Sequence, residues 1–277
     1  MRSWLIIGGH GYIGRSLVNS VRHRFPFEKI TVPSRSELID VMALPNRLVG
    51  LHIGRVNVVI LAAAGVSGVM DATGIEFNAS WIPAAAIAMA QVPNVSVLVT
   101  GSSFEYGASG VLEEALDPVT SILAPVEAYG ISKRDGFDIL KPEIAALGSL
   151  GYARIFQVWG GSEYPLRLAP SLTENARRSQ MTQLNSGSTI RDFIHVEDVS
   201  RQIIDYFEFS DKYPKVFNVC SGEGVTVLEF AKRLLSSMNY DPAELLESSD
   251  SASHPYPRLV GVRQPIFGDS IGFSIRL

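Results

Sequence analysis

A glycine-rich turn lies near the start of the 277-residue chain, directly after its first apolar run. Trp4-Leu5-Ile6-Ile7 has the composition of a buried strand, and Gly8, Gly11 and Gly14 follow it at three-residue spacing. A helical segment from about Ile13 to Arg24 comes next. Strand, glycine turn and helix in this order are typical of a site for a dinucleotide pyrophosphate, because glycine permits positive φ and lets an anion approach main-chain N–H groups.

Short apolar runs alternate with longer segments of helical periodicity, and this alternation predicts βαβ units around a parallel sheet. The run Asn57–Ala62 is apolar on both faces, as expected for a central strand. Further strands are predicted at Lys29–Val32, Val95–Thr100, Ala153–Val158, Arg191–Val196 and Val216–Val219, and helices at Glu76–Gln91, Ala128–Leu140 and Val199–Phe209. The second of these helices is expected to end or kink near Pro142. We predict an α/β fold, a Rossmann-type doubly wound parallel sheet with a smaller C-terminal lobe.

The regular pattern stops after Gly160-Gly161 and returns near Arg191, which indicates a second part of the fold. We predict a dinucleotide-binding domain over residues 1–159, with returning segments at about 192–221. Residues 160–191 and 222–277 are predicted to form the smaller, substrate-binding lobe.

Composition narrows the possible partners. Hydrophobic residues make up 46% of the chain, enough for a large core, and the net charge of −4 comes without any basic block. We therefore expect neither nucleic acid nor membrane as a partner. The longest apolar stretch, Ile82–Val92, is too short to cross a bilayer, and the lone Cys220 excludes an intramolecular disulfide and a multi-cysteine metal site. We expect a cytoplasmic protein without a metal.

The residues after the second predicted strand bear on which dinucleotide is bound. An acidic residue there would accept the ribose hydroxyls of NAD, but the chain has Pro33-Ser34-Arg35-Ser36. Arg35 can hold a 2′-phosphate by two hydrogen bonds, and Ser34 adds a hydroxyl, so the sequence favours NADP over NAD. The alternative is a solvated surface arginine. His10 is either a contact of the adenosine phosphate or a turn residue without such a role.

Tyr129 and Lys133 are four residues apart in a predicted helix and therefore lie on one face of it. Because a neighbouring ammonium favours phenolate, we expect Lys133 to lower the pKa of Tyr129 and to prepare it for proton transfer to a carbinol oxygen. Ser102 ends a strand at the sheet edge where ligands bind in doubly wound folds, and its hydroxyl is placed to bind the same oxygen. The alternatives are a surface pair and a hydroxyl that caps local backbone.

Six ordered motifs carry a resemblance to a known family. They are Gly8-x-x-Gly11-x-x-Gly14, Leu61-Ala62-Ala63-Ala64 with Asn78 in the next helix, Ser102-Ser103-Phe104-Glu105-Tyr106-Gly107, Tyr129-x-x-x-Lys133, Arg191-Asp192-Phe193-Ile194-His195-Val196-Glu197-Asp198-Val199 and Asn218-Val219-x-Ser221-Gly222. From Trp4 to about Leu235 the chain resembles the extended short-chain dehydrogenase/reductase family, of the NAD-dependent epimerase/dehydratase type, whose members modify nucleotide sugars.

The resemblance implies roles for the residues at matching positions. Ser102, Tyr129 and Lys133 would form a catalytic triad, with Tyr129 as the acid/base and Lys133 also holding the nicotinamide ribose. A nucleotide-sugar substrate would contact Ser102, Ser103 and Arg191, whose planar guanidinium suits a diphosphate. The residues expected to bind the cofactor are Gly8, His10, Gly11, Tyr12, Ile13, Gly14, Ser34, Arg35, Leu61, Ala62, Ala63, Asn78, Tyr129 and Lys133. Structural roles near the site are expected for Asn78, which would brace backbone, and for Asp192, His195 and Asp198.

Departures from the family pattern bear on the reaction. Sugar 4,6-dehydratases need a carboxylate pair just after the catalytic hydroxyl, where this chain has Ser103 and Phe104, and Glu105 is expected to point elsewhere. Reductases that also epimerise use a cysteine near this place, from which Cys220 is distant. We therefore predict reduction of the 4-keto group of a nucleotide-linked 6-deoxyhexose. The alternatives are an NAD-dependent nucleotide-sugar 4-epimerase and a non-catalytic dinucleotide-binding regulator.

The resemblance also bears on the small lobe and on assembly. Trp159 and Gly161 replace the tyrosine and proline of the family's Y-G-P element, which leaves the shape of the sugar pocket open. Gly272-Phe273 lies so near the end of the sequence that the family's final helix is expected to be short or missing. Arg258 or Arg263 would then supply a second cation for the diphosphate. A homodimer is expected, paired through Ala84–Ala90 and the helix that carries Tyr129.

Overall fold

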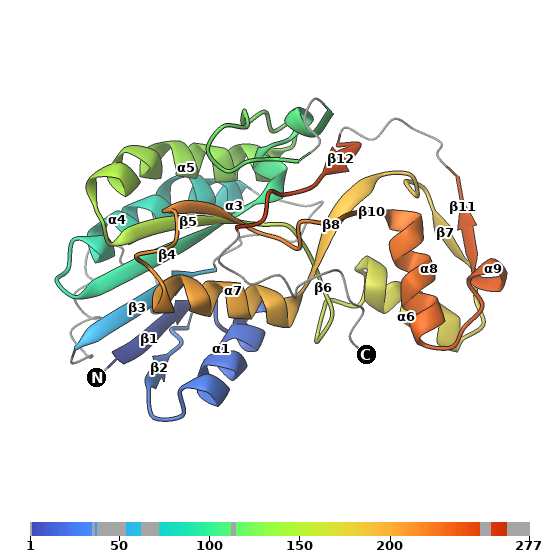
Figure 1. Ribbon diagram of the computed structural model, residues 1–277, viewed down its shortest axis with the longest axis horizontal. Coiled ribbons are helices and arrows are strands. Elements are labelled where there is room, and N and C mark those ends of the chain that lie inside the picture. The colour runs from blue at the N-terminus through green and yellow to red at the C-terminus, as the bar shows by residue number, and fades with distance from the viewer. Residues whose placement is uncertain are drawn as a thin grey trace.

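The computed structural model describes residues 2–34, 37, 54–61, 72–111, 115–249 and 256–264. Its centre is a six-stranded parallel sheet in the order β2-β1-β3-β4-β5-β9 (Figure 1). The strands are β1 (Arg2–Ile7), β2 (Lys29–Thr31), β3 (Arg55–Ile60), β4 (Val95–Ser102), β5 (Leu150–Ile155) and β9 (Val216–Val219). The predicted α/β fold with a doubly wound parallel sheet is confirmed.

Helices cover both faces of this sheet. On one face α1 (Tyr12–Arg24) and α7 (Val196–Glu208) pack against Trp4 and Ile6 of β1. On the other face α4 (Ile82–Ala90) and α5 (Ala128–Ala146) pack against Leu5 and Ile7. Successive residues of a strand point to opposite faces, so a strand covered on both sides is apolar throughout, as its sequence predicted.

The chain reverses its direction of travel across the sheet at β1. It moves outward from β1 to β2 and then returns past β1 to β3, β4, β5 and β9. In such a sheet the connections after β1 and β3 leave on opposite faces, which opens a crevice outside the carboxyl ends of these strands. The glycine turn follows β1 directly, and it therefore lies at this crevice.

A second sheet and several helices form the smaller part of the molecule, on the right in Figure 1. Strand β8 (Ile190–His195) pairs with β6 (Gln157–Trp159), β10 (Gly224–Thr226) and β12 (Arg258–Leu259). The remaining elements are α6 (Leu168–Arg177), β7 (Thr182–Leu184), α8 (Val227–Ser237), α9 (Pro242–Leu245) and β11 (Leu246–Ser248). Trp159, Phe193 and Phe230 lie in its core, where the rings of Phe193 and Phe230 stack with centroids 3.9 Å apart.

The strand predicted over Ala153–Val158 is two strands. β5 pairs with β4 and β9 in the large sheet and ends at Ile155, whereas β6 pairs with β8 in the small one. The chain therefore passes from one sheet to the other at Phe156. A continuous apolar run does not reveal this change of partner, because both strands are buried.

Two helices differ from their predictions. The helix predicted over Glu76–Gln91 begins earlier, as α3 (Ala72–Glu76), and contains a π-helical segment over Phe77–Trp81 before α4. Helix α5 continues through Pro142 to Ala146. Pro142 has no N–H to donate to the carbonyl of Asp138, four residues before it. Both residues are exposed, so water can bind this carbonyl instead. Burial of Ile144 one turn further on favours continuation of the helix.

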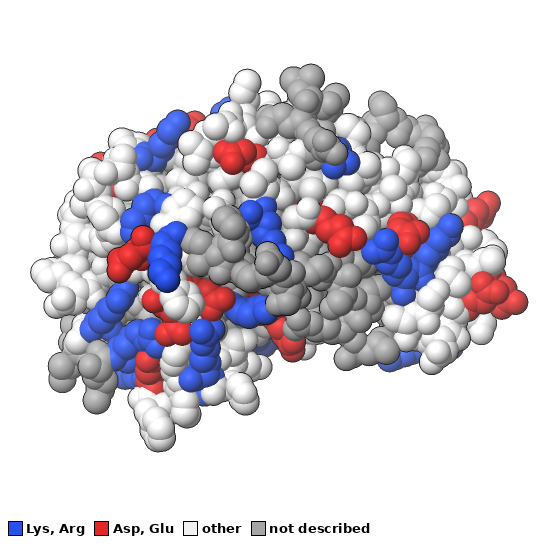
Figure 2. Space-filling view, in the orientation of Figure 1, with Lys and Arg blue, Asp and Glu red and all other residues white. Residues whose placement is uncertain are grey.

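Charged side chains of both signs are interspersed on the face shown in Figure 2, over α1 and α7 and again over α8. Arg2 pairs with Glu28 and Glu208, and Arg24 pairs with Asp205 and Glu208, which ties the ends of α1 and α7 together. Within the described ranges, no helix has the length and apolar character needed to cross a membrane.

Candidate active site

The glycine turn is shaped to hold an anion. Gly8 has φ +85°, and a Cβ at Gly14 would overlap the carbonyl oxygen of Gly8 and the backbone of Gly9. Helix α1 begins after Gly11 with no side-chain cap and no acidic residue in its first turn. Its free N–H groups and dipole therefore favour a negatively charged ligand, and the close packing of bare backbone fits a dinucleotide pyrophosphate.

Two residues after this turn tie it to the small lobe. The Tyr12 hydroxyl donates to the carbonyl of Gly160 over 2.6 Å, and Arg15 donates to the carbonyls of His10 and Ser162. Ile13 packs against the core on the α1 side of the sheet. Thus Tyr12 and His10 have structural contacts in addition to their predicted place beside the cofactor.

The end of β2 carries an acidic residue that the sequence analysis missed. The main-chain N–H and the hydroxyl of Ser34 both donate to Glu37 Oε2, over 2.7 and 2.6 Å. The hydroxyl predicted to bind a 2′-phosphate therefore faces a carboxylate. Arg35, Ala62 and Ala63 lie outside the described residues, while Leu61 continues β3 by donating its N–H to the carbonyl of Ile7.

Ser102, Tyr129 and Lys133 converge at the carboxyl end of β4. Ser102 is the last residue of β4, and Tyr129 and Lys133 lie in the first two turns of α5. Ser102 lowers the pKa of Tyr129, which places its hydroxyl near the phenol, and Lys133 Nζ donates to the carbonyl of Thr100 over 3.3 Å. A phenol, a hydroxyl and an ammonium thus meet at the sheet edge where the crevice predicts a ligand.

The expected effect of Lys133 on Tyr129 is wrong for this structure. Burial raises the pKa of Tyr129, and the groups that lower this pKa are Ser102 and Arg167. Burial also lowers the pKa of Lys133 to about 8, against the attraction of Glu105. Burial disfavours the phenolate and has the largest effect on Tyr129, so the phenol remains protonated at neutral pH.

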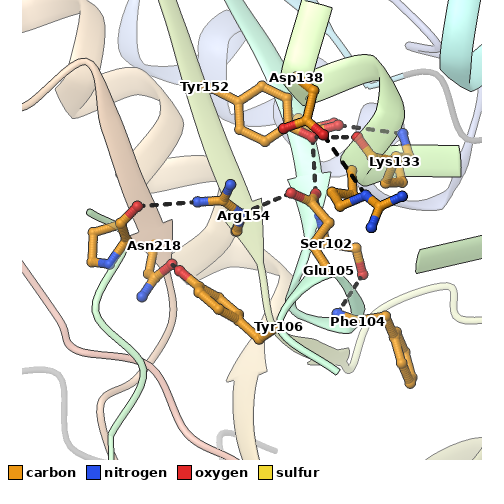
Figure 3. A network of polar contacts seen from close by, with 12 residues as sticks. Ser102, Phe104, Glu105, Tyr106, Lys133, Asp138, Tyr152, Arg154 and Asn218 are labelled. Carbon is orange, nitrogen blue, oxygen red and sulfur yellow. Dashed lines mark hydrogen bonds and ion pairs between the residues drawn. The ribbon is translucent and has the colours of Figure 1, made fainter. Parts of the chain in front are cut away.

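A buried polar network lies behind this group, and Figure 3 shows its members. Glu105 lies in the 3-10 turn Ser103–Glu105 that follows β4. Its Oε1 accepts from the N–H of Ser102 over 2.7 Å and from the hydroxyl of Tyr152 over 2.8 Å. Its Oε2 lies 2.7 Å from Nε of Arg154. As expected, this carboxylate points away from the site.

Aromatic side chains occupy the other side of Ser102. The Phe104 ring packs edge to face on Tyr129, with centroids 6.2 Å apart, and on Tyr256, with centroids 5.3 Å apart. The Tyr256 hydroxyl accepts from the N–H groups of Val126 and Glu127, just before α5 begins. A segment near the C-terminus therefore braces the helix that carries Tyr129.

A family comparison bears directly on this arrangement. The family model described as "NAD dependent epimerase/dehydratase family" matches residues 4–220. The chain belongs to this family. A search of curated protein sequences gave no match.

Solved structures of this family share the fold at low sequence identity. A dTDP-glucose 4,6-dehydratase from Bacillus anthracis, in complex with NAD, aligns with a TM-score of 0.78 and 16% identity over 96% of this chain and 89% of that one. A Thermus thermophilus UDP-glucose 4-epimerase, also with NAD, aligns with a TM-score of 0.77 and 19% identity over 99% and 95%. A dTDP-4-dehydrorhamnose reductase from Clostridium acetobutylicum aligns with a TM-score of 0.75 and 14% identity over 95% and 90%.

Asn78 reaches the site of this epimerase/dehydratase-family protein through its side-chain amide. Its Nδ2 donates to the hydroxyl of Ser132 over 3.3 Å, and Ser132 donates to the carbonyl of Tyr129 over 2.9 Å. The residue lies in the π-helical segment, which packs against α5. This placement agrees with a bracing role, while contact with a cofactor stays a prediction.

Arg191 lies on β8, in the small sheet, and is buried. Its Nη1 donates to the carbonyl of Ile190 over 2.8 Å, and burial lowers its pKa to about 10. Arg258 lies on the neighbouring strand β12, where Leu259 pairs with Arg191, whereas Arg263 packs beside Gly222. Because Arg258 pairs with Ile190 and successive residues of a strand point to opposite faces, Arg258 and Arg191 lie on opposite faces of the small sheet, and a second cation for the diphosphate stays a prediction.

The segment after Arg191 has structural contacts. Asp192 is buried and accepts from the N–H and hydroxyl of Ser221 and from the N–H groups of Gly222 and Gly261. His195 caps α7 through Nδ1, and Asp198 lies in the first turn of that helix. These contacts agree with the structural roles expected for Asp192, His195 and Asp198.

Glu163 is a buried carboxyl that the sequence analysis did not single out. Its side chain is 3% exposed, its Oε1 lies 3.5 Å from Nε of Arg167, and its Oε2 accepts no hydrogen bond from any residue in the described ranges. Burial raises its pKa to about 7. It lines a cavity of about 700 Å³ with Trp159 and Arg178. Nothing local in the loop Gly160–Pro165 marks this glutamate as buried, since only packing between the lobes makes it so.

Proposed function

We propose that this protein reduces the 4-keto group of a nucleotide-linked 6-deoxyhexose, with NAD(P)H as the reductant. The glycine turn would hold the pyrophosphate of the dinucleotide, which would supply the hydride for the carbonyl carbon when bound. Tyr129 donates its phenolic proton to the carbonyl oxygen, and Ser102 hydrogen-bonds the same oxygen. A phenol that stays protonated at neutral pH is in the state that this direction of reaction requires.

The choice of reduction over elimination of water and over epimerisation next to the ketone depends on the side chains that follow Ser102. The two side chains that follow Ser102 in the described part of the chain are the buried hydroxyl of Ser103 and the ring of Phe104, and neither is a carboxyl or a thiol. Glu105, the nearest carboxylate in the sequence, is held by Arg154. Elimination of water and epimerisation next to a ketone both need such a group to move a proton from carbon. Hydride transfer with one proton at oxygen needs only Ser102, Tyr129 and Lys133.

The substrate class rests on Arg191 and on the relatives. A guanidinium can hold a diphosphate by paired hydrogen bonds, and its lowered pKa of about 10 still leaves it charged at neutral pH. The solved relatives include a dTDP-4-dehydrorhamnose reductase and proteins titled for UDP- and dTDP-linked sugars. These titles support a nucleotide sugar as the substrate of this chain.

A second candidate, an NAD-dependent 4-epimerase, is favoured by Glu37. A carboxylate at the end of β2 suits the free ribose hydroxyls of NAD and repels the 2′-phosphate of NADP. The sequence favoured NADP because Arg35 and Ser34 could bind its 2′-phosphate. The Ser34 hydroxyl donates to Glu37 instead, so only Arg35 still favours NADP. An epimerase keeps its NAD through the reaction, so the choice of cofactor bears on the choice of activity.

The test is a direct assay. Purified protein is mixed with dTDP-, CDP- and GDP-linked 4-keto-6-deoxyhexoses, and oxidation of NADPH and NADH is followed at 340 nm, with Tyr129→Phe as the control. The proposal predicts oxidation that depends on the keto sugar and is lost in the control. Interconversion of UDP-hexose 4-epimers without net oxidation would establish the epimerase instead, and absence of both activities would overturn the proposal.

A further inference from the structure

Glu105 has contacts with both elements that carry the candidate catalytic residues. It is fully buried in the turn after β4, and its Oε1 accepts from the main-chain N–H of Ser102 over 2.7 Å. The Tyr152 hydroxyl donates to the same oxygen over 2.8 Å and lies 3.4 Å from the carbonyl oxygen of Lys133. One carboxylate therefore connects the end of β4 with the second turn of α5, as Figure 3 shows.

Gly101 leaves room for the Glu105 carboxylate because it has no Cβ. A Cβ at Gly101, next to Ser102, would overlap Glu105 Oε1 and lie 2.5 Å from the Tyr152 hydroxyl. Any other residue at this position of β4 would displace the carboxylate or the phenol. The contact between Glu105 and the strand end therefore depends on Gly101 as well as on Arg154.

Glu105 is also the charge that acts on the Lys133 ammonium. Burial lowers the pKa of Lys133 to about 8, and the attraction of Glu105 opposes this fall. Lys133 Nζ donates to the Thr100 carbonyl of β4. The ionisable groups that the packed elements bring near are Glu105 from the turn after β4, Tyr152 and Arg154 from β5, and Tyr129 from α5 itself. Of these, only Glu105 carries a carboxyl group.

We propose that Glu105 is a positioning residue of the active site: its carboxylate holds the strand end that carries Ser102 and is linked through the Tyr152 hydroxyl to the helix that carries Tyr129 and Lys133, where it places a buried carboxylate near the Lys133 ammonium. This role rests on the proposed function, because it assumes that these three residues act together. Glu105 is not an acid or base for the substrate, since both of its oxygens are engaged by Ser102, Tyr152 and Arg154.

A purely structural ion pair would also explain why Glu105 is buried beside Arg154, and the two roles differ in what they predict for Lys133. If Glu105 only stabilises the fold, a folded variant without its charge leaves the titration of Lys133 unchanged. If Glu105 supports the ammonium, the same variant lowers the midpoint of that titration, because an attractive charge is removed while burial remains.

The experiment follows the six lysines of the full-length protein by NMR of ¹³C-labelled side chains between pH 6 and 11, with the Lys133 signal assigned by its loss in Lys133→Met. In Glu105→Gln the Lys133 midpoint is expected to fall by about one pH unit relative to the wild type. Tyr106→Phe is the matched control, because it removes a buried hydroxyl that donates to Asn218 on β9. An unchanged midpoint in folded Glu105→Gln overturns the proposal.

Glu105→Gln leaves Arg154 buried without its anion and can fail to fold. Glu105→Gln/Arg154→Gln then replaces it, since it leaves no unpaired buried charge. A smaller fall in the midpoint is expected, because the repulsion from Arg154 is removed together with the attraction of Glu105. The titration needs no substrate, so it tests Glu105 even if no keto sugar is turned over. Where turnover is found, Tyr152→Phe is expected to lower kcat at least fivefold with little change in KM, and Tyr106→Phe is not.

Discussion

Glu105 and Arg154 form an ion pair in the interior, with Oε2 and Nε 2.7 Å apart and both side chains at most 1% exposed. The guanidinium also lies over the rings of Phe137 and Tyr106, at 4.3 and 5.2 Å from their centroids. Such a pair is costly to break, because the partner that remains is an uncompensated buried charge.

Removing one partner of this pair should therefore destabilise the fold strongly. Arg154→Met is expected to lower the free energy of unfolding by about 3–5 kcal/mol, measured by urea denaturation. Glu105→Gln/Arg154→Met should recover part of this loss, since no buried charge is left. Equal stability of the wild type and Arg154→Met would contradict the account of the pair.

Tyr129→Phe separates an enzyme from a regulator that only binds the dinucleotide. The substitution keeps the ring that packs on Phe104 and removes the proton donor. Turnover is expected to fall by roughly 10²–10⁴-fold, with dinucleotide affinity nearly unchanged. Steady-state kinetics and a binding titration check the two parts, and a variant with wild-type turnover would exclude Tyr129 as the acid.

Gly14→Ala tests the fit of the glycine turn. Its Cβ would overlap the backbone of Gly8 and Gly9, which must then move away from the position that cradles a pyrophosphate. Dinucleotide affinity should fall at least tenfold by fluorescence titration. Gly148→Ala is the matched control, because a Cβ there meets nothing within 4 Å. A Gly14→Ala protein with wild-type affinity would place the cofactor elsewhere.

Glu163 predicts a dependence of stability on pH. Its folded pKa of about 7 lies above the usual carboxyl value, so between roughly pH 4.5 and 7 the folded state binds more protons than the unfolded state. The free energy of unfolding therefore falls as pH rises through this window. Glu163→Gln is expected to be more stable than the wild type at pH 8, by roughly 1–3 kcal/mol, and equally stable near pH 4.

Glu174→Gln serves as the control for this measurement. Glu174 is exposed on α6 and pairs with Arg178, so its removal should change stability little at either pH. Thermal unfolding of the three proteins at pH 4 and pH 8 gives the comparison. A Glu163→Gln protein without any gain at pH 8 would show that the carboxyl is not held in an unfavourable charged state.

The parts of the fold that the sequence predicts are those set by local pattern. Alternating apolar runs predict the parallel sheet, and the glycine spacing predicts the turn after β1, because both depend on residues close in sequence. The four-residue spacing of Tyr129 and Lys133 likewise places both on one face of α5. Ser102 joins them because the carboxyl ends of parallel strands share one edge of the sheet.

What the sequence does not predict depends on packing between distant segments. Burial raises the pKa of Tyr129, which the neighbouring ammonium was expected to lower. No local sequence pattern predicts that burial. Glu163 is in the loop after β6, which packs against Tyr12 from a distant part of the sequence. Glu37 accepts hydrogen bonds from Ser34, three positions before it in the sequence. It lies just beyond Pro33–Ser36, the segment from which the dinucleotide was predicted.

The dinucleotide carried by freshly purified protein, identified by mass after denaturation, tests the central claim most directly, together with its exchange against added NADPH and NADH. A reductase with the site described here should bind a nicotinamide dinucleotide and exchange it readily with the added reduced form. Tightly held NAD that does not exchange would contradict the reductase and favour the 4-epimerase. A protein that binds neither dinucleotide would contradict both.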